Sequence, residues 1–303
     1  MNVLLTGGTG FVGQRLRRCL IEQGHLVRTL SHSCKTGQNN IYCDLMNDSI
    51  PIDLFNSIDV VFHLAGFAHD LRESSEVEHL YYKLNTYSTI KLAKLAAISG
   101  VHRFIFVSSV KAGGDKIVKN FRGQDIQNGP EGIYGKSKLK AELGLLKICR
   151  KTSMNVSIVR PSLVYGPGVK GNLHLMLSGI EKGWFPPLPE TGNKRSMIHV
   201  DDLVRAIVLV SESDGTNGEV FVATDGSAYS SKEIYNAMCT VLGKKIPKWS
   251  IPRAVFDFIG VFNSNIKHKL NKLLGDELYS SAKLEALGFK AEKTLKDMNE
   301  TDF

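Results

Sequence analysis

The sequence has few cysteines and no long hydrophobic run. Its five cysteines are an odd number, include no Cys-x-x-Cys pair and have no histidine at metal-ligand spacing, which argues against a disulfide framework and a zinc site. No stretch approaches the roughly 20 apolar residues of a membrane span, and the longest, residues 254–262, is interrupted by Asp257. The first residues lack the basic and apolar segments of a secretory signal. We therefore expect a cytoplasmic protein with reduced thiols and no transmembrane segment.

The composition is that of an ordinary globular protein, with 43% hydrophobic and 22% charged residues in a chain of 303. That length supports one large domain or two medium ones. Lysine and arginine number 38 against 30 acidic residues, and the net charge of +8 favours anionic partners. Because the sequence has no zinc finger, homeodomain or RNP-type aromatic motif, we expect no nucleic-acid partner.

Short apolar runs alternate with helical patterns through the first two thirds of the chain. The runs are continuous rather than alternating, as in strands covered on both faces. This rhythm predicts an α/β fold, a Rossmann-like doubly wound parallel sheet with ligands at the carboxyl edge of its strands. The predicted strands are 2–5, 26–30, 60–64, 104–107 and 156–159, and the predicted helices are 12–23, 79–99 and 134–152.

Proline and glycine cluster after residue 165, at 166–168 and 186–189, which indicates a smaller second lobe. We expect residues 1–165 to bind the cofactor and residues 166–303 to form a substrate-binding lobe, with a helix at about 199–212 returning to the first part. The apolar run 254–262, followed by Lys267, His268, Lys269 and Lys272, could lie on a membrane surface. An amphipathic helix packed on the second lobe is the favoured interpretation.

A glycine-rich turn follows the first predicted strand directly and opens the first helix. Gly7, Gly10 and Gly13 would allow a tight turn, close approach of the backbone to a pyrophosphate, and close packing of helix on strand. The free N–H groups of the helix start, at Phe11 and Val12, would then face that anion. The turn predicts a dinucleotide site rather than a merely flexible loop.

The choice between NAD and NADP depends on the end of the second strand. An acid that binds the ribose hydroxyls is missing there, and Ser31 stands in its place. Arg28, His32 or Lys35 could meet a 2′-phosphate, so both cofactors stay open, with a slight preference for NADP. Asp44, next to Leu45, could reach the adenine amino group or could simply cap a turn.

Tyr134 and Lys138 are four residues apart on a predicted helix, hence on one face. An ammonium that close would lower the pKa of Tyr134 toward neutrality and make the phenol an acid/base for alcohol–ketone interconversion. Lys138 would also reach the nicotinamide ribose. Ser109 follows a strand at the ligand edge and could donate a hydrogen bond to a substrate carbonyl.

Taken together, these motifs resemble the extended short-chain dehydrogenase/reductases of the NAD-dependent epimerase/dehydratase family, which include UDP-galactose 4-epimerases and bacterial O-antigen enzymes. The resemblance runs from end to end of the chain and is poorly specific for substrate. It rests on TGGTGFVG at 6–13, VFHLAG at 61–66, SSV at 108–110, YGKSK at 134–138, RPSLVYGPG at 160–168, RSMIHVDDL at 195–203 and LGF at 287–289.

The resemblance implies roles for individual residues. Ser109, Tyr134 and Lys138 would be catalytic, and Asn85 would support their network beside the substrate. Arg195 would grip the diphosphate of a nucleotide sugar, with Asn172 as a second polar contact; Lys111 could contact a phosphate but is more simply a surface lysine. The cofactor-lining positions would be Gly7, Gly10, Phe11, Val12, Gly13, Ser31, Asp44, Leu45, Leu64, Ala65, Gly66 and Pro161.

One departure from the family narrows the reaction. The 4,6-dehydratases carry an Asp-Glu pair where this chain has Val110-Lys111, so dehydration is not expected. The favoured interpretation is a 4-reductase of a UDP-4-keto-6-deoxy-amino sugar in polysaccharide biosynthesis. A UDP-sugar 4-epimerase is the alternative, and a non-catalytic NADP-sensing protein is a third. The resemblance also implies a homodimer through helices at about 86–99 and 134–150. Extra apolar positions there give partial support: Ile90, Ala93, Ala97, Leu139, Leu143 and Leu146.

Overall fold

A seven-stranded parallel sheet forms the centre of the computed structural model, which describes residues 1–32, 39–68, 74–113, 129–262, 270 and 273–298. The strand order is β3-β2-β1-β4-β5-β6-β9, and every pairing is parallel. This confirms the predicted Rossmann-like α/β fold. The strands are β1 (Asn2–Thr6), β2 (Leu26–Ser31), β3 (Asn40–Tyr42), β4 (Val60–His63), β5 (Arg103–Val107), β6 (Asn155–Pro161) and β9 (Val220–Ala223).

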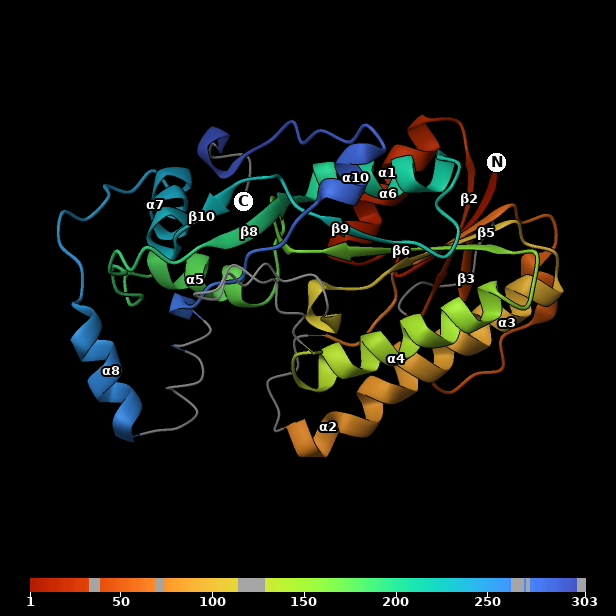
Figure 1. Cartoon of the computed structure of the whole chain (residues 1–303), viewed down its shortest axis with the longest axis horizontal. Coiled ribbons are helices and arrows are strands. Elements are labelled where there is room, and N and C mark those ends of the chain that lie inside the picture. Colours follow the sequence, from red (N-terminus) through yellow and green to blue (C-terminus); the bar gives the residue numbers. More distant parts are fainter. Residues whose placement is uncertain (33–38, 69–73, 114–128, 263–269, 271–272, 299–303) are drawn as a thin grey trace, which may run out of the picture.

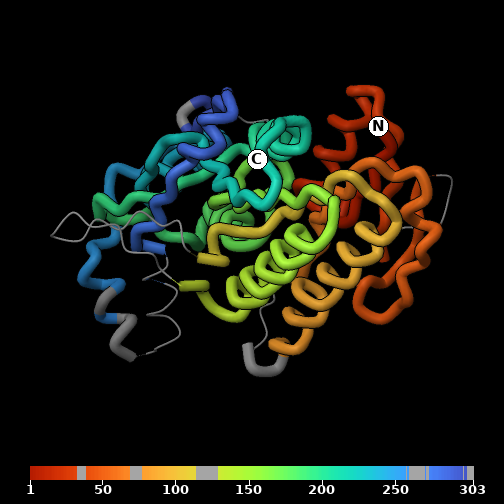
Figure 2. The backbone as a smooth tube through the Cα atoms, turned by 45° about the vertical axis from the view of Figure 1, so that its right-hand side comes forward, coloured from red at the N-terminus to blue at the C-terminus, as the bar shows by residue number. Residues whose placement is uncertain are grey.

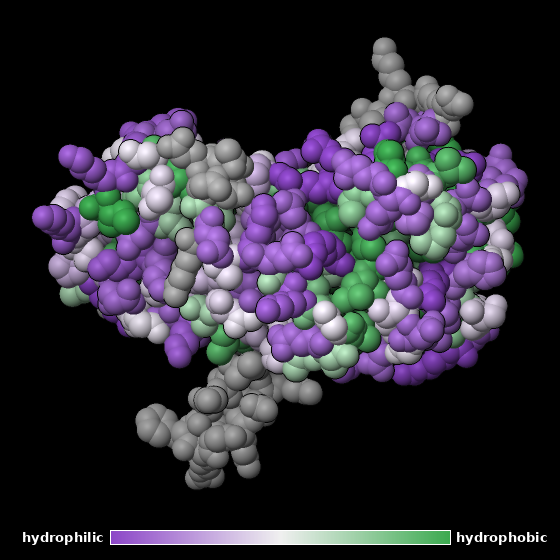
Figure 3. Space-filling model, turned by 90° about the horizontal axis from the view of Figure 1, so that it is seen from above, coloured by the Kyte–Doolittle hydropathy of each residue, from purple (hydrophilic) through white to green (hydrophobic). Residues whose placement is uncertain are grey.

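Helices cover both faces of the sheet (Figure 1). One face packs on α1 (Phe11–Glu22) and α6 (Val200–Glu212), the other on α3 (Thr89–Ile98) and α4 (Gly132–Cys149). Successive strand side chains alternate between the two cores: Val3 and Leu5 join the first, and Leu4 joins the second. Seen from above, the surface is largely hydrophilic, with hydrophobic groups gathered in its right-hand half (Figure 3).

The helix predicted at 79–99 is a composite of three segments. It begins as α2 (Ser74–Tyr81), widens into a π-helical segment η2 (Tyr82–Ser88), and continues as α3. A π-helical segment inside an α-helix often marks a functional site, and here it contains the buried Asn85. The simple periodicity of the sequence does not reveal this change of helix type.

A second lobe is built on the three-stranded sheet β10-β8-β7, made of β7 (Leu163–Tyr165), β8 (Arg195–His199) and β10 (Ala228–Tyr229). Its own core includes Tyr165, Met176 and Met238. The green-to-blue segments of this lobe lie opposite the red N-terminal ones, while α6 returns beside α1 (Figure 2). Its helices are α5 (Asn172–Glu181), α7 (Ser231–Val241) and α8 (Arg253–Phe262). Two short elements follow: α10 (Ala282–Ala286), which contacts β9 of the large sheet, and η4 (Leu295–Asp297).

The helices expected at a dimer contact are only partly turned outward. Ala93 is fully buried in the core between the sheet and these helices, and Ile90, Ala97 and Leu146 are partly buried against the same core. Ala93 was therefore wrongly assigned to an outer face. Leu143 is 60% exposed on α4.

Within the parts of the chain that the structure describes, no helix is both long and apolar enough to span a bilayer. The predicted packing of residues 254–262 on the second lobe is seen through Phe256, which joins the core of that lobe. Lys267, His268, Lys269 and Lys272 lie outside the described residues.

Candidate active site

The glycine turn joins β1 to α1 in a form that only glycine permits. Gly7 has a φ of 72°, and a Cβ there would lie 2.6 Å from the Ala65 nitrogen. A Cβ on Gly13 would overlap the Gly7 carbonyl. The N-cap of α1 is Gly10, which has no side chain to satisfy the first N–H groups. The turn therefore presents an uncapped, positively polarised helix start at the carboxyl edge of the sheet.

The end of β2 brings together some of the residues expected to select the cofactor. Ser31 is buried as the last residue of β2. The Met46 N–H lowers the pKa of the nearby Asp44 carboxyl, with smaller contributions from the Asn47 side chain and from exposed His32. Arg28 is not at this edge, because it lies mid-strand and donates to the Leu54 carbonyl at 2.9 Å. Lys35 lies outside the described residues.

Asp44 has a structural role in its own turn. Its two carboxylate oxygens accept from the Met46 N–H at 2.8 Å and from the Asn47 side chain at 2.7 Å. The capping role named as the alternative is therefore present. Leu45 beside it is buried in the sheet core.

The three predicted catalytic residues meet where β5 ends and α4 begins. Ser109 follows β5 and shares a hydrogen bond with the phenol of Tyr134. Lys138 is one turn further along α4, 3% exposed, and donates to the Val107 carbonyl at 3.0 Å. Its ammonium also lies 4.5 Å from the centre of the Phe106 ring. Tyr134 is partly exposed, so a ligand at this edge can touch it.

The predicted effect of Lys138 on Tyr134 is wrong for this structure. Burial raises the pKa of Tyr134 to about 12, and the hydrogen bond from Ser109 opposes this only in part. Burial also lowers the pKa of Lys138 to about 8. The reason is geometric: the Lys138 ammonium is held by Val107 and Phe106, and burial of the phenol is the largest influence on the pKa of Tyr134.

Asn85 ties the loop after β4 to the catalytic helix. Its amide accepts from Phe67 N–H at 2.6 Å and donates to the Ser137 hydroxyl at 3.0 Å. Asn85 is fully buried, so it can support this network from inside the protein, as the resemblance implied. The same loop places Gly66 where a Cβ would lie 3.2 Å from the Lys138 nitrogen. Leu64 and Ala65 form the wall against which Gly7 packs.

Lys111 is not a surface lysine. Its ammonium lies 2.6 Å from Glu131, just before α4, and 2.6 Å from Glu277 in the second lobe. The other oxygen of Glu277 lies 2.8 Å from Arg195, which is 7% exposed and also donates to the Leu273 carbonyl. Arg195 is therefore joined to the catalytic helix through alternating charges. Glu131 and Glu277 were missed, since no local motif marks them.

The remaining predicted positions lie around the same edge. Pro161 is buried as the last residue of β6, and exposed Asn172 is the first residue of α5. Phe11 packs against the core of the second lobe, and Val12 packs under the sheet. Across the described residues, no cluster of three His, Cys, Asp or Glu side chains could hold a metal ion.

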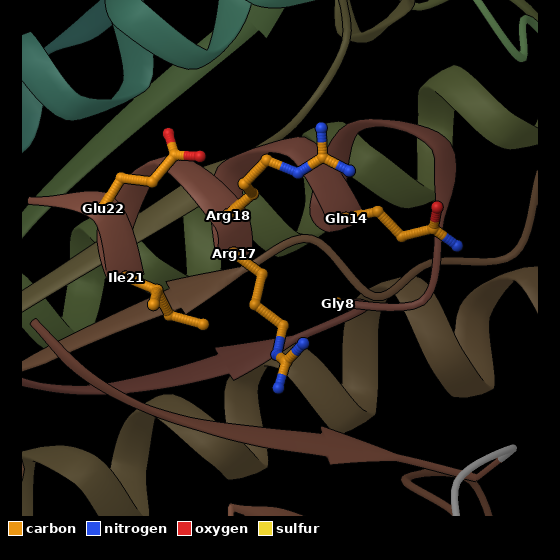
Figure 4. Close-up of a pocket in the computed structure, with 6 residues that line it drawn as sticks. All are labelled: Gly8, Gln14, Arg17, Arg18, Ile21 and Glu22. Carbon is orange, nitrogen blue, oxygen red and sulfur yellow. The ribbon is translucent and has the colours of Figure 1, made fainter.

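A separate depression of about 420 Å³ lies along the outer face of α1 (Figure 4). The side chains of Arg17 and Arg18 point to opposite sides of the helix rather than into a common space. Its lining includes none of the three predicted catalytic residues, so this depression is separate from the edge where they meet. The residues that line it are Gly8, Gln14, Arg17, Arg18, Ile21 and Glu22.

Relatives are found along the whole chain. Residues 3–223 match the model of the NAD dependent epimerase/dehydratase family. A UDP-glucose 4-epimerase of Vibrio cholerae is 34% identical over 310 residues, covering 98% of this chain and 92% of that protein. The N-acetyl-alpha-D-glucosaminyl-diphospho-ditrans,octacis-undecaprenol 4-epimerase of Escherichia coli O157:H7 is 26% identical, covering 97% and 92%. The Thermotoga maritima UDP-glucose 4-epimerase with UDP-glucose shares the fold, with a TM-score of 0.75, 24% identity and coverage of 99% and 96%.

Proposed function

The chain belongs to the NAD dependent epimerase/dehydratase family, and from this premise we propose that it is a UDP-sugar 4-epimerase. The observation that carries the proposal is the meeting of Ser109, Tyr134 and Lys138 at the edge where the glycine turn opens. The similarity to the Vibrio cholerae enzyme over nearly the whole chain supports the choice of reaction.

The glycine turn fits a dinucleotide. A side chain at Gly7 or Gly13 would fill the space between turn, helix and the loop after β4. The N–H groups at the start of α1 would hold the pyrophosphate, and Ser31 would lie at the adenosine ribose. When bound, NAD would supply reversible hydride transfer at C4 of the sugar, and its oxidised ring would add a positive charge to the site.

Tyr134 handles the proton of the reaction. Its phenolate oxygen accepts the proton of the C4 hydroxyl as that carbon is oxidised, and gives it back when the ketone is reduced. Ser109 donates a hydrogen bond to the same C4 oxygen and steadies the phenol in the meantime. Lys138, buried one turn away, is positioned to hold the nicotinamide ribose and to favour phenolate once further positive charge is present. For inversion, the ketone must turn so that the hydride returns to its other face.

We assign the substrate to the second lobe. Residues 1–165, completed by α6, would bind the cofactor, and residues 166–303 would bind the nucleotide sugar. Arg195 suits a diphosphate because a guanidinium fork binds phosphate oxygens bidentately. The diphosphate would share Arg195 with Glu277, and through Glu277 and Lys111 its binding would be felt at the start of α4. Asn172 would add a contact from α5.

A 4-reductase of a UDP-4-keto-6-deoxy-amino sugar is the second candidate. Ser31 favours it, because the missing carboxylate weakens the case for permanently held NAD and admits the 2′-phosphate of NADP. Either enzyme would work in the cytoplasm on precursors of a surface polysaccharide such as O-antigen. We propose a homodimer joined through the outer faces of η2, α3 and α4, where Tyr87 of η2 and Leu143 of α4 are 57% and 60% exposed.

The two candidates are separated by incubating the purified chain with UDP-glucose and UDP-N-acetylglucosamine, with and without added NAD. Conversion to the C4 epimer without net use of cofactor supports the epimerase. A chain that releases no NAD on denaturation, makes no epimer, and consumes NADPH only with a 4-keto sugar is the reductase. In that case Ser31→Asp should shift preference from NADPH to NADH, since a carboxylate repels the 2′-phosphate.

A further inference from the structure

Large apolar side chains are exposed together at one end of the second lobe. They come from the chain after α5, from the loop between α7 and α8, and from α8 itself, which projects from the lobe in Figure 1. We call them the α8 surface: Trp184, Ile246, Trp249, Val255 and Phe258, which are 62%, 47%, 64%, 42% and 65% exposed. Single exposed apolar residues are ordinary, but a group of this kind marks an interaction site.

Hydrogen bonds hold the contributing segments side by side. The Ile251 N–H donates to the Pro187 carbonyl at 3.1 Å, which joins the stretch after α5 to the stretch before α8. The Lys244 ammonium donates to the Ile180 carbonyl at 2.7 Å, which joins the end of α7 to the end of α5. The apolar groups are thus presented by one tied structure rather than by independent loops.

The helix α8 is anchored on one side and apolar on the other. Phe256 is 7% exposed and belongs to the core of the second lobe. Val255 and Phe258 are three residues apart, so they share a face, and Phe258 is two residues from Phe256, nearly on the opposite side. The packing of Phe256 into the core of the second lobe therefore turns the face with Val255 and Phe258 outward.

Exposed cations lie in the same segments as this apolar group. Residues 181–188 and 242–262 carry five of them and two acidic residues, Glu181 and Asp257. Long basic side chains can lay their stems along apolar surface and keep their charge at an anionic boundary. The five are Lys182, Lys244, Lys245, Lys248 and Arg253.

We propose that the α8 surface binds the face of a lipid bilayer that contains anionic lipid. Aromatic and aliphatic side chains at headgroup depth, with lysines around them, are the chemistry of an interfacial membrane contact. The large parallel sheet lies toward the other end of the molecule in Figure 1, so docking through α8 leaves it clear. The proposal does not depend on the reaction proposed above.

The chain carries its own probe for this test, because its only two tryptophans are Trp184 and Trp249. The full-length protein is titrated with vesicles of phosphatidylcholine containing about one third phosphatidylglycerol, and tryptophan emission is followed. We expect a blue shift, quenching by brominated lipid, and co-sedimentation with the vesicles. The double variant Lys245→Glu with Lys248→Glu should weaken vesicle binding at least tenfold, because each cation near the membrane surface contributes about fivefold to the affinity. Binding should also weaken at high salt.

Val255→Ser with Phe258→Ser should abolish the blue shift while both tryptophans remain. The matched control is Ile98→Ser, which removes a 75% exposed apolar side chain on α3 and should leave vesicle binding unchanged. No shift with anionic vesicles at low salt overturns the proposal, and so does equal binding to pure phosphatidylcholine. A third outcome would show that the surface joins two copies of the chain instead. In that case the tryptophan emission is already blue-shifted without vesicles, and the mass in solution is twice that of one chain and is halved by Phe258→Ser.

Discussion

Replacing Gly135 by alanine should disable the site while leaving the fold in place. Gly135 follows Tyr134 in the first turn of α4, and a Cβ there would overlap the Lys111 carbonyl oxygen and lie 2.9 Å from its carbon. That oxygen is fixed backbone, since it also accepts the Glu131 N–H at 2.9 Å. The start of α4 must therefore move by roughly 1 Å, and such a misplacement of a reacting group costs about 100-fold in rate.

The stability change should be much smaller than the loss of activity. Overpacking costs about 1–3 kcal/mol, whereas alanine gains up to about 1 kcal/mol over glycine inside a helix. We expect Gly135→Ala to unfold at slightly lower urea concentration and to lose about 100-fold in kcat. The matched control is Gly129→Ala, just before the same helix, where a Cβ would meet nothing within 4 Å. Turnover of Gly135→Ala within fivefold of the parent would refute the reasoning.

Three further changes test the site and the proposed dimer contact. Lys138→Met should abolish turnover yet raise stability at pH 7 by about 2 kcal/mol, because it removes a burial cost of roughly 3 kcal/mol and a hydrogen bond worth about 1. Folding lowers the pKa of Lys138 from 10.5 to about 8. Between these two pH values the unfolded parent therefore binds more protons than the folded parent, so the free energy of unfolding should rise with pH. Urea unfolding should show this rise for the parent and not for Lys138→Met. Arg195→Ala should weaken nucleotide-sugar binding in calorimetry without changing NAD affinity, and equal sugar affinity would count against its assignment. Leu143→Glu should convert a dimer to a monomer in light scattering, and a monomeric parent would remove the dimer altogether.

The fold and the family could be predicted from the sequence because their signals are local. Continuous apolar strands, the glycine turn and the Tyr134–Lys138 spacing each depend on a few neighbouring residues. The family expected from these motifs is confirmed by the match over residues 3–223. Helix and strand limits differ from the predicted ones by only a few residues, apart from the π-helical segment.

The parts that were missed depend on distant residues and on burial. Lys111 and Glu277 are separated by 166 residues, and nothing near either one marks their pairing. The pKa of Tyr134 was predicted from helical spacing alone, but the depth of the phenol and the contacts of Lys138 with Val107 and Phe106 decide it. Such properties can be determined only once the packing of the elements is known.

The central claim is that this chain removes a hydride from C4 of a UDP-sugar and returns it to the same carbon. The most direct measurement is incubation with UDP-glucose carrying deuterium at C4, followed by nuclear magnetic resonance of the product, with Tyr134→Phe in parallel. We expect UDP-galactose that keeps its deuterium at C4 and is formed without net use of cofactor, and a loss of turnover of about 10²–10⁴-fold in Tyr134→Phe. Loss of the label to solvent, or unchanged turnover by Tyr134→Phe, would contradict it.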